Sequence, residues 1–95
     1  MGEFTGFEWD ERKNERCKRE RGFDFHFAIK IFETDIDQVE DKRADYGETR
    51  FIATGQVQDY VLVVVWTPRG RIQRIISARR ASKRERERFY GNRES

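Results

Sequence analysis

The chain has 95 residues, of which 40% are charged and 14% aromatic, and its formal net charge is +2. This length suits one domain with one hydrophobic core, and the aromatic content argues against a disordered chain. No stretch approaches the roughly 18 consecutive apolar residues of a membrane span, and the N-terminus lacks the apolar run of a secretory signal, so we expect a cytoplasmic protein with no membrane partner.

The first elements are a short strand and a polar helix. Residues 4–9 are rich in aromatic side chains, which predicts the strand. Asp10 is a candidate N-cap for a helix over residues 11–21. Gly22 can end that helix in the left-handed conformation. Cys17 lies within the helix; as the only cysteine it forms no internal disulfide and lacks the spacing partners of a zinc site, so we expect no metal and no cofactor.

The stretch "FDFHFAIKIF" at residues 23–32 fits two structures. Its alternating apolar residues predict a strand, and they are Phe23, Phe25, Phe27, Ile29 and Ile31. One helical face is also apolar, comprising Phe25, Ala28, Ile29 and Phe32, and Asp24 can cap a helix. The alternation favours a strand, whereas the family resemblance described below favours a helix, and we predict the helix.

Three strands at hairpin spacing are predicted in the second half, over residues 50–54, 60–66 and 71–78. Residues 60–66 are apolar throughout, so we expect them to form the central strand, covered on both faces. A further short strand near residues 36–39 and a turn at Gly47 precede them. The final helix begins at Ser82, which forms a Ser-x-x-Glu capping box with Glu85, and runs to Tyr90.

Charge is distributed unevenly along the chain. Residues 33–48 contain seven acidic and two basic side chains, whereas residues 69–95 contain ten basic and three acidic ones. These two segments can attract each other, or the basic one can bind an anionic partner.

Three motifs in order, "FEWD" at residues 7–10, "YGETR" at 46–50 and "RIISARRASKRERERFY" at 74–90, resemble the BrnT family of ribonuclease toxins from bacterial type II toxin–antitoxin pairs. The resemblance implies one toxin-like domain over residues 1–95, for which we expect flexible ends at 1–6 and 91–95. It implies a small α+β fold related to RelE-type ribonucleases, and we expect a twisted antiparallel sheet of about four strands, two N-terminal helices and one C-terminal helix.

The resemblance also implies partners and an activity. It implies an endoribonuclease that acts on RNA. It also implies a cognate BrnA-like antitoxin with a ribbon-helix-helix domain. The toxin would contact operator DNA only through this antitoxin. The chain departs from the family pattern at the end of the first helix, where relatives often have Asn and then Lys-His-Gly and this chain has Cys17 and Glu20-Arg21-Gly22. It also has Ala44 where relatives often carry a histidine a few residues before Gly-Glu. Loss of those histidines would impair the activity, or require other groups, if they serve catalysis in relatives.

Cleavage of RNA without a metal requires deprotonation of the 2′-hydroxyl, stabilisation of the phosphorane charge and protonation of the leaving oxygen. The single histidine, His26, lies among phenylalanines and is expected to be a packed or surface residue. The candidate catalytic residues are Arg79, Arg74, Arg80, Arg50 and, as a base, Glu48, with Tyr46 or Tyr90 as a possible acid. The candidate RNA-binding residues are Arg69, Arg71, Lys83 and Arg84. We expect the arginines to converge on one phosphate near the start of the last helix, where free amides attract anions.

Each candidate also has a structural interpretation. Arg74 can pair with the acidic segment, Glu48 can bridge Arg50, and residues 83–88 can form a solvated helix face. Two other functions therefore stay open beside the ribonuclease: a catalytically impaired module that binds RNA or an antitoxin, and an interaction protein whose basic face meets an acidic protein.

Overall fold

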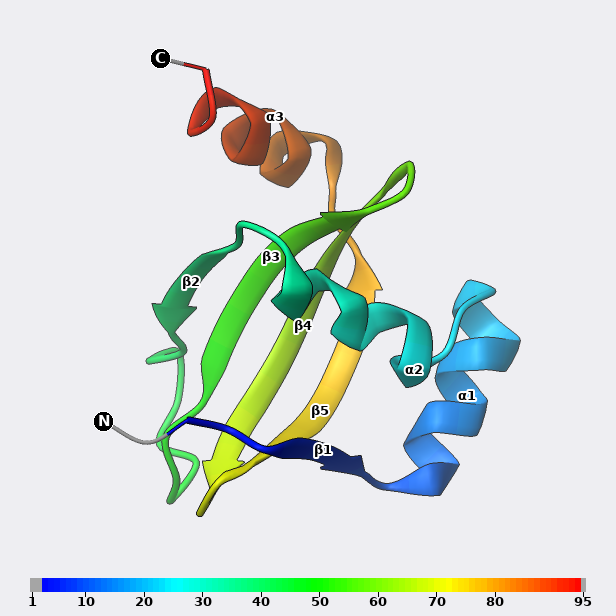
Figure 1. Cartoon of the computed structure of the whole chain (residues 1–95), viewed down its shortest axis with the longest axis vertical. Helices are drawn as coiled ribbons and strands as arrows, with labels where there is room; N and C mark the ends of the chain where they lie inside the picture. Colours follow the sequence, from blue (N-terminus) through cyan, green and yellow to red (C-terminus); the bar gives the residue numbers. More distant parts are fainter. Residues whose placement is uncertain (1–2, 95) are drawn as a thin grey trace.

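A five-stranded sheet organises the domain in the computed structural model, which describes residues 3–94 (Figure 1). In spatial order the strands are β1 (Gly6–Trp9), β5 (Ile72–Arg80), β4 (Tyr60–Arg69), β3 (Phe51–Val57) and β2 (Asp37–Glu40). β1 pairs with β5 in parallel, and the other neighbours are antiparallel.

The prediction of an antiparallel sheet with about four strands is therefore wrong in two respects. The sheet has five strands, because the short segments β1 and β2 both join it as edge strands. It is mixed rather than antiparallel, because β1 and β5 are separated by most of the chain and no hairpin dictates their relative direction.

β4 is the central strand, as its continuous apolar run predicted. Its side chains alternate between two clusters: Leu62, Val64 and Trp66 join the main core, while Val61 and Val63 join a smaller cluster on the other face. Both faces of this strand are thus covered along most of its length.

α1 (Glu11–Arg21) has the predicted ends. The Asp10 side chain accepts a hydrogen bond from the backbone N–H of Arg12, and Gly22 has a left-handed φ of 81° with its amide bonded to the Lys18 carbonyl. Two residues of this polar helix, Asn14 and Cys17, are buried. The Asn14 side chain accepts a hydrogen bond from the Phe25 amide, which ties α1 to the next helix.

The helix prediction for residues 23–32 is confirmed. α2 (Phe25–Ala28) continues into the 3₁₀ helix η1 (Ile29–Glu33), and Asp24 caps it by accepting from the amide of Phe27. The three fully buried residues, Phe25, Ala28 and Ile31, follow helical spacing, so the apparent alternation did not determine the fold.

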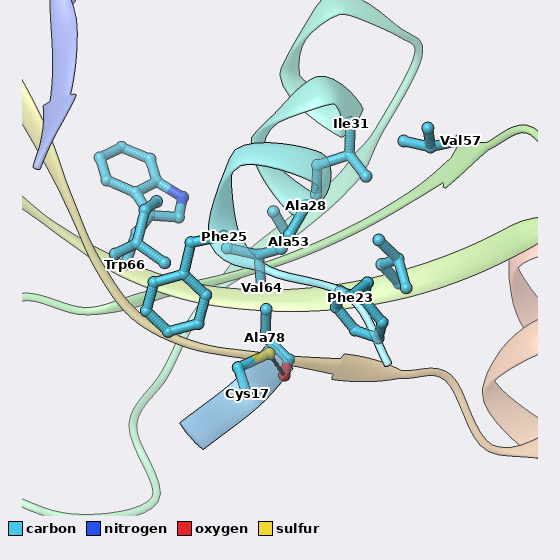
Figure 2. Packing of buried hydrophobic residues seen from close by; sticks show 12 residues of the cluster. Cys17, Phe23, Phe25, Ala28, Ile31, Ala53, Val57, Val64, Trp66 and Ala78 are labelled. Carbon is cyan, nitrogen blue, oxygen red and sulfur yellow. Dashed lines mark hydrogen bonds between the residues drawn. The ribbon is translucent and has the colours of Figure 1, made fainter. Parts of the chain in front are cut away.

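The main core lies between one face of the sheet and the helices α1, α2 and η1 (Figure 2). Trp66 and Val64 of the sheet face Phe25 and Ala28 of α2 in this core. Cys17 is buried there as well, and its thiol donates to the carbonyl of Ala78 at 3.6 Å. No helix within residues 3–94 is long and apolar enough to cross a membrane.

α3 (Lys83–Gly91) follows β5 and lies at one end of the sheet (Figure 1). The predicted capping box is present, because Ser82 accepts from the Glu85 amide and the Glu85 side chain accepts from the Ser82 amide. Arg93 then bonds to Asp37 of β2 at 3.1 Å, and near the other terminus the Thr5 amide bonds to the Arg71 carbonyl. Flexibility of residues 1–6 and 91–95 stays a prediction, and residues 1, 2 and 95 lie outside the described part of the chain.

Candidate functional site

The sheet face opposite α1 and α2 carries most of the candidate residues, and we call it the open face. Strand register arranges its side chains in three rows across the strands. The first row comprises Asp37, Thr54, Val63 and Arg79; the second, Val39, Ile52, Val65 and Ser77; the third, Thr67, Arg74 and Glu8, extended by Arg50 and Asp41. Phe89 of α3 covers the face beside Val61 and Val63, and residues 41–50 approach its other end through the bond from Thr67 to the Thr49 carbonyl.

A β-bulge in β5 brings Arg74 and Arg79 to this same face. Regular alternation along β5 would place Arg74 and Ala78 on one face, but the structure places them on opposite faces. The register shifts by one between Val65 and Trp66, which pair with Ser77 and Ile75 and leave Ile76 as the extra residue. Arg79 and Arg80 also belong to β5 itself rather than to the segment after it.

Arg79 is fixed by the first turn of α3. Its Nη1 and Nη2 atoms donate to the two carboxylate oxygens of Glu85 at 2.7 and 2.9 Å. Hydrogen bonding from Arg79 lowers the pKa of Glu85 to about 2, and the Ser82 amide acts in the same direction. The pKa of Arg79 is raised above its ordinary value chiefly by Glu85, while burial and the positive charge of Arg43 act in the opposite direction.

The other arginines of the open face also have carboxylate partners. Arg74 donates to Glu8 of β1 at 3.0 Å, so it pairs with that strand and not with the acidic segment. Arg50 stacks on the Tyr46 ring at 4.0 Å and donates to Glu48 at 3.2 Å. Glu48 also lies 3.7 Å from Arg69, so this candidate base bridges two arginines.

The structure does not bring the remaining candidates to this group. Arg80 pairs with Leu62 on the helix-covered face, where its guanidinium stacks on Tyr60 at 4.5 Å. Arg71 lies exposed in the turn between β4 and β5, and Lys83 and Arg84 lie exposed in the first turn of α3. His26 packs edge-on against Trp9 on the helix side of the sheet, with ring centroids 4.7 Å apart.

Two arginines were missed by sequence reasoning. Arg88, assigned there to a solvated helix face, lines a cleft of about 330 Å³ between α3 and the strands β2 and β3, together with Glu85 and Phe89. Arg43 lies in the segment after β2 and forms a two-point ion pair with the buried Asp41. The spacing of Asp41 and Arg43 is visible in the sequence. The burial of Asp41, which makes that spacing significant, is not visible there.

The arrangement suits stabilisation of a polyanion by fixed guanidinium groups, because arginine stays charged and offers paired N–H donors to phosphate oxygens. Fixed donors aimed at developing negative charge require little reorganisation during a reaction. Among residues 3–94, no group of three or more His, Cys, Asp or Glu side chains is arranged to hold a metal ion.

Comparisons with known proteins agree with the resemblance seen in the sequence. A family model described as "Ribonuclease toxin, BrnT, of type II toxin-antitoxin system" matches residues 9–85. Among solved structures, the chain is similar to the Brucella abortus ribonuclease toxin BrnT, with 24% identity, a TM-score of 0.61, and coverage of 83% of this chain and 99% of that one. None of the curated proteins compared with the chain matches it.

Proposed function

Because the chain belongs to the BrnT family of ribonuclease toxins of type II toxin–antitoxin systems, we propose that it is a cytoplasmic endoribonuclease that cleaves RNA on its open face without a metal. The observation that carries this proposal is the bulge in β5, which turns Arg74 and Arg79 to one face, where Arg50 also lies. Helices packed on a twisted sheet with a helix at the C-terminal end also suit the proposed kinship with RelE-type ribonucleases.

The proposed reaction is attack of a 2′-hydroxyl on the adjacent phosphorus, with release of the 5′-oxygen of the next nucleotide. Arg79 and Arg74 stabilise the charge of the phosphorane, and Arg50 contacts the same or the neighbouring phosphate. Glu48 acts as the base that takes the 2′-hydroxyl proton, and a Tyr46 or Tyr90 hydroxyl protonates the leaving oxygen. Arg69, Arg71, Lys83 and Arg84 extend the binding surface along the RNA backbone; Arg80, on the other face, has no role in this reaction.

The test is cleavage of single-stranded RNA by purified, antitoxin-free protein in the presence of EDTA. We expect products that end in a 2′,3′-cyclic phosphate, and an unchanged DNA oligonucleotide of the same sequence, because DNA lacks the attacking hydroxyl. Removal of one donor to a developing oxyanion typically reduces kcat by about 10²-fold to 10³-fold, and we expect Arg79→Ala to fall in that range.

Arg19→Ala is the matched control, since it removes one exposed arginine from α1, on the other side of the sheet. It should cleave at the wild-type rate. Intact RNA after incubation with the wild-type protein would refute the catalytic proposal, and activity that disappears with EDTA would refute its metal independence.

A second candidate is a module that binds RNA or the antitoxin but no longer cleaves. Two observations favour it: His26 packs against Trp9 away from the arginines, and Glu48 is engaged by Arg50 and Arg69. It predicts salt-sensitive RNA binding without products.

We further propose that a ribbon-helix-helix antitoxin of the BrnA type neutralises the chain, and that the pair contacts operator DNA through the antitoxin alone. Expression of the toxin in bacteria should stop growth unless the antitoxin is supplied. Growth of cells that express the wild-type chain alone would contradict the proposed toxicity.

A further inference from the structure

Arg43 is an exposed guanidinium that a buried carboxylate holds in a fixed orientation. The Arg43 side chain is 68% exposed, whereas the side chain of its partner Asp41 is 0% exposed. Arg43 Nε and Nη2 donate to the two oxygens of Asp41 at 2.8 and 2.7 Å, and the Arg43 amide donates to the same carboxylate at 3.1 Å. A solvent-exposed side chain with this much rotational freedom is not usually tied down in this way.

Asp41 is itself held from several directions. Its amide donates to the Arg50 carbonyl at 2.7 Å, which continues the β2–β3 ladder, and the Tyr46 hydroxyl donates to its carboxylate at 3.2 Å. Hydrogen bonds from Arg43 hold the pKa of Asp41 well below its usual range. Asp41 therefore stays ionised and fixed, and Arg43 is oriented by the sheet itself.

Each of the two guanidinium groups, those of Arg43 and Arg79, keeps one edge that its carboxylate partner does not occupy. Asp41 occupies the Nε and Nη2 edge of Arg43 and leaves the Nη1 and Nη2 fork pointing away from the carboxylate. Glu85 occupies the Nη1 and Nη2 fork of Arg79, and within residues 3–94 no hydrogen bond engages its Nε. Each arginine thus retains a two-donor edge, which is the geometry that binds a phosphate with two parallel hydrogen bonds.

The two arginines come from opposite ends of the open face. Arg79 stands at the end covered by α3, and Arg43 belongs to the segment that approaches the other end. Between them lie the exposed Ser77 and the half-buried Val65 and Ile52, none of which carries a charge. The positive charge of Arg43 acts to lower the pKa of Arg79, against the larger opposite effect of Glu85. Both fixed cations therefore attract an anion that lies on the open face.

We propose that Arg43 and Arg79 both bind the phosphate backbone of the RNA, and that Asp41 is the positioning residue for Arg43. The inference rests on the proposed function for the identity of the ligand, but it concerns binding and not the chemical step. It adds Arg43 to the site and gives a buried acidic residue a role in binding an anion.

The test measures binding of a single-stranded RNA oligonucleotide that is 2′-O-methylated at every position, so that cleavage cannot interfere. Fluorescence anisotropy across a NaCl series gives the affinity and its salt slope. Arg43→Ala should weaken binding about tenfold and reduce the slope by about 0.7, the contribution of one phosphate contact on a single strand. Arg43→Lys should keep most of the salt slope yet lose most of the affinity, because lysine keeps the charge but not the fork.

Lys42→Ala is the matched control, because Lys42 is the exposed neighbour of Arg43 and its removal changes the net charge equally. Its affinity should stay within about twofold of wild type. If Arg43→Ala binds as tightly as Lys42→Ala, the assignment of Arg43 is overturned.

Asp41→Asn separates positioning from charge. Removal of a negative charge alone would strengthen RNA binding, whereas release of Arg43 should weaken it several-fold. The double variant Asp41→Asn/Arg43→Ala should bind like Arg43→Ala alone, because both changes remove the same contact. Tighter RNA binding by Asp41→Asn would overturn the positioning role of Asp41. If this buried substitution prevents folding, the variants of the exposed Arg43 still test whether Arg43 binds RNA.

The same samples distinguish this inference from the proposed function. A wild-type protein that binds the methylated RNA through Arg43 but leaves unmodified RNA intact supports the inference and overturns the ribonuclease proposal. A wild-type protein that does not bind the methylated RNA overturns the inference, whatever its activity on other RNA.

Discussion

Glu85 illustrates how one carboxylate serves both a helix and a site. Its side chain completes the capping box with Ser82 and also fixes the guanidinium of Arg79. In the folded protein its pKa is about 2, below the ordinary 4.5, so folding favours the ionised form. The resulting stabilisation is complete above the ordinary pKa and is lost as the pH falls from about 4.5 towards 2.

We therefore expect Glu85→Gln to reduce the free energy of unfolding at pH 7 and to flatten its dependence on pH below 4.5. Because Glu85 is partly exposed, solvent screening limits the effect to about 1 kcal/mol. Urea denaturation at a series of pH values measures it. Glu87→Gln, on the exposed side of the same helix, should follow the wild-type curve, and an unchanged pH dependence in Glu85→Gln would contradict the assignment.

At the scale of single residues, the sequence did not indicate to which face of the sheet each candidate side chain points. Arg74 and Arg79 were both candidates, but they are five positions apart, so alternation alone would have put them on opposite faces. The bulge at Ile76 is a tertiary feature with no glycine or proline to mark it. Arg43 was missed because its significance comes from the burial of Asp41, which depends on how residues 41–50 fold back on the sheet.

Among the elements, α3 is held against the sheet by one large apolar side chain, that of Phe89. Phe89 is 3% exposed and packs with Val61, Val63 and Ala81, whereas the neighbouring Tyr90 is 41% exposed. We expect Phe89→Ala to lower the free energy of unfolding by about 3 kcal/mol and to weaken RNA binding, because Glu85 on the same helix would no longer fix Arg79.

Chemical denaturation and the methylated-RNA assay test this expectation together. Tyr90→Ala is the control for stability and should change the free energy of unfolding by less than about 1 kcal/mol, because Tyr90 is exposed. Loss of stability in Phe89→Ala without any loss of RNA affinity would show that the position of α3 does not matter to the site.

Close packing of η1 on β3 depends on a glycine. A Cβ atom at Gly55 would lie 2.8 Å from Ile31 Cβ and 3.0 Å from a methyl carbon of Ile36, whereas one at Gly91 meets nothing within 4 Å. We expect Gly55→Ala to destabilise the protein by about 1–3 kcal/mol through overpacking. Gly91→Ala should be neutral or stabilising by about 0.5 kcal/mol, since it restricts only the unfolded chain. Thermal unfolding of both variants compares them directly, and equal melting temperatures would contradict the close approach.

Elements with local signals were predictable, and those that depend on distant partners were not. Asp10, Gly22, Asp24 and Ser82 act through hydrogen bonds to nearby backbone, so the ends of the helices followed from the sequence. The cap at Asp24 favours a helix over residues 23–32, although their apolar and polar side chains alternate. The edge strand β1 finds its partner β5 across most of the chain, and neither its direction nor its membership in the sheet had a local signal.

On the scale of the whole molecule, the acidic and basic segments attract each other, which is one of the two possibilities that the sequence allowed. Arg93 bonds to Asp37 at 3.1 Å and lies 3.6 Å from Asp35, so the basic end is tied to the acidic segment at the edge strand β2. The arginines of the open face instead have single local carboxylate partners and keep further N–H donors. The basic end therefore offers an anion fewer cations than its composition indicates, because Arg93 is already paired within the chain.

Adjacent residues of β5 provide a test of which face the RNA occupies. Arg79 and Arg80 are both exposed and differ by one position, yet strand alternation places them with Val63 on the open face and with Leu62 on the helix-covered face. If RNA binds the open face, Arg79→Ala should weaken binding of the methylated oligonucleotide about tenfold, while Arg80→Ala should change it by no more than about twofold, since it loses only long-range attraction. Anisotropy at one moderate salt concentration is sufficient, with thermal unfolding to show that both variants fold. Equal losses would mean that the RNA contacts the edge of the sheet, where both side chains are accessible, and a larger loss for Arg80→Ala would move the interface to the face that carries Tyr60 and α2.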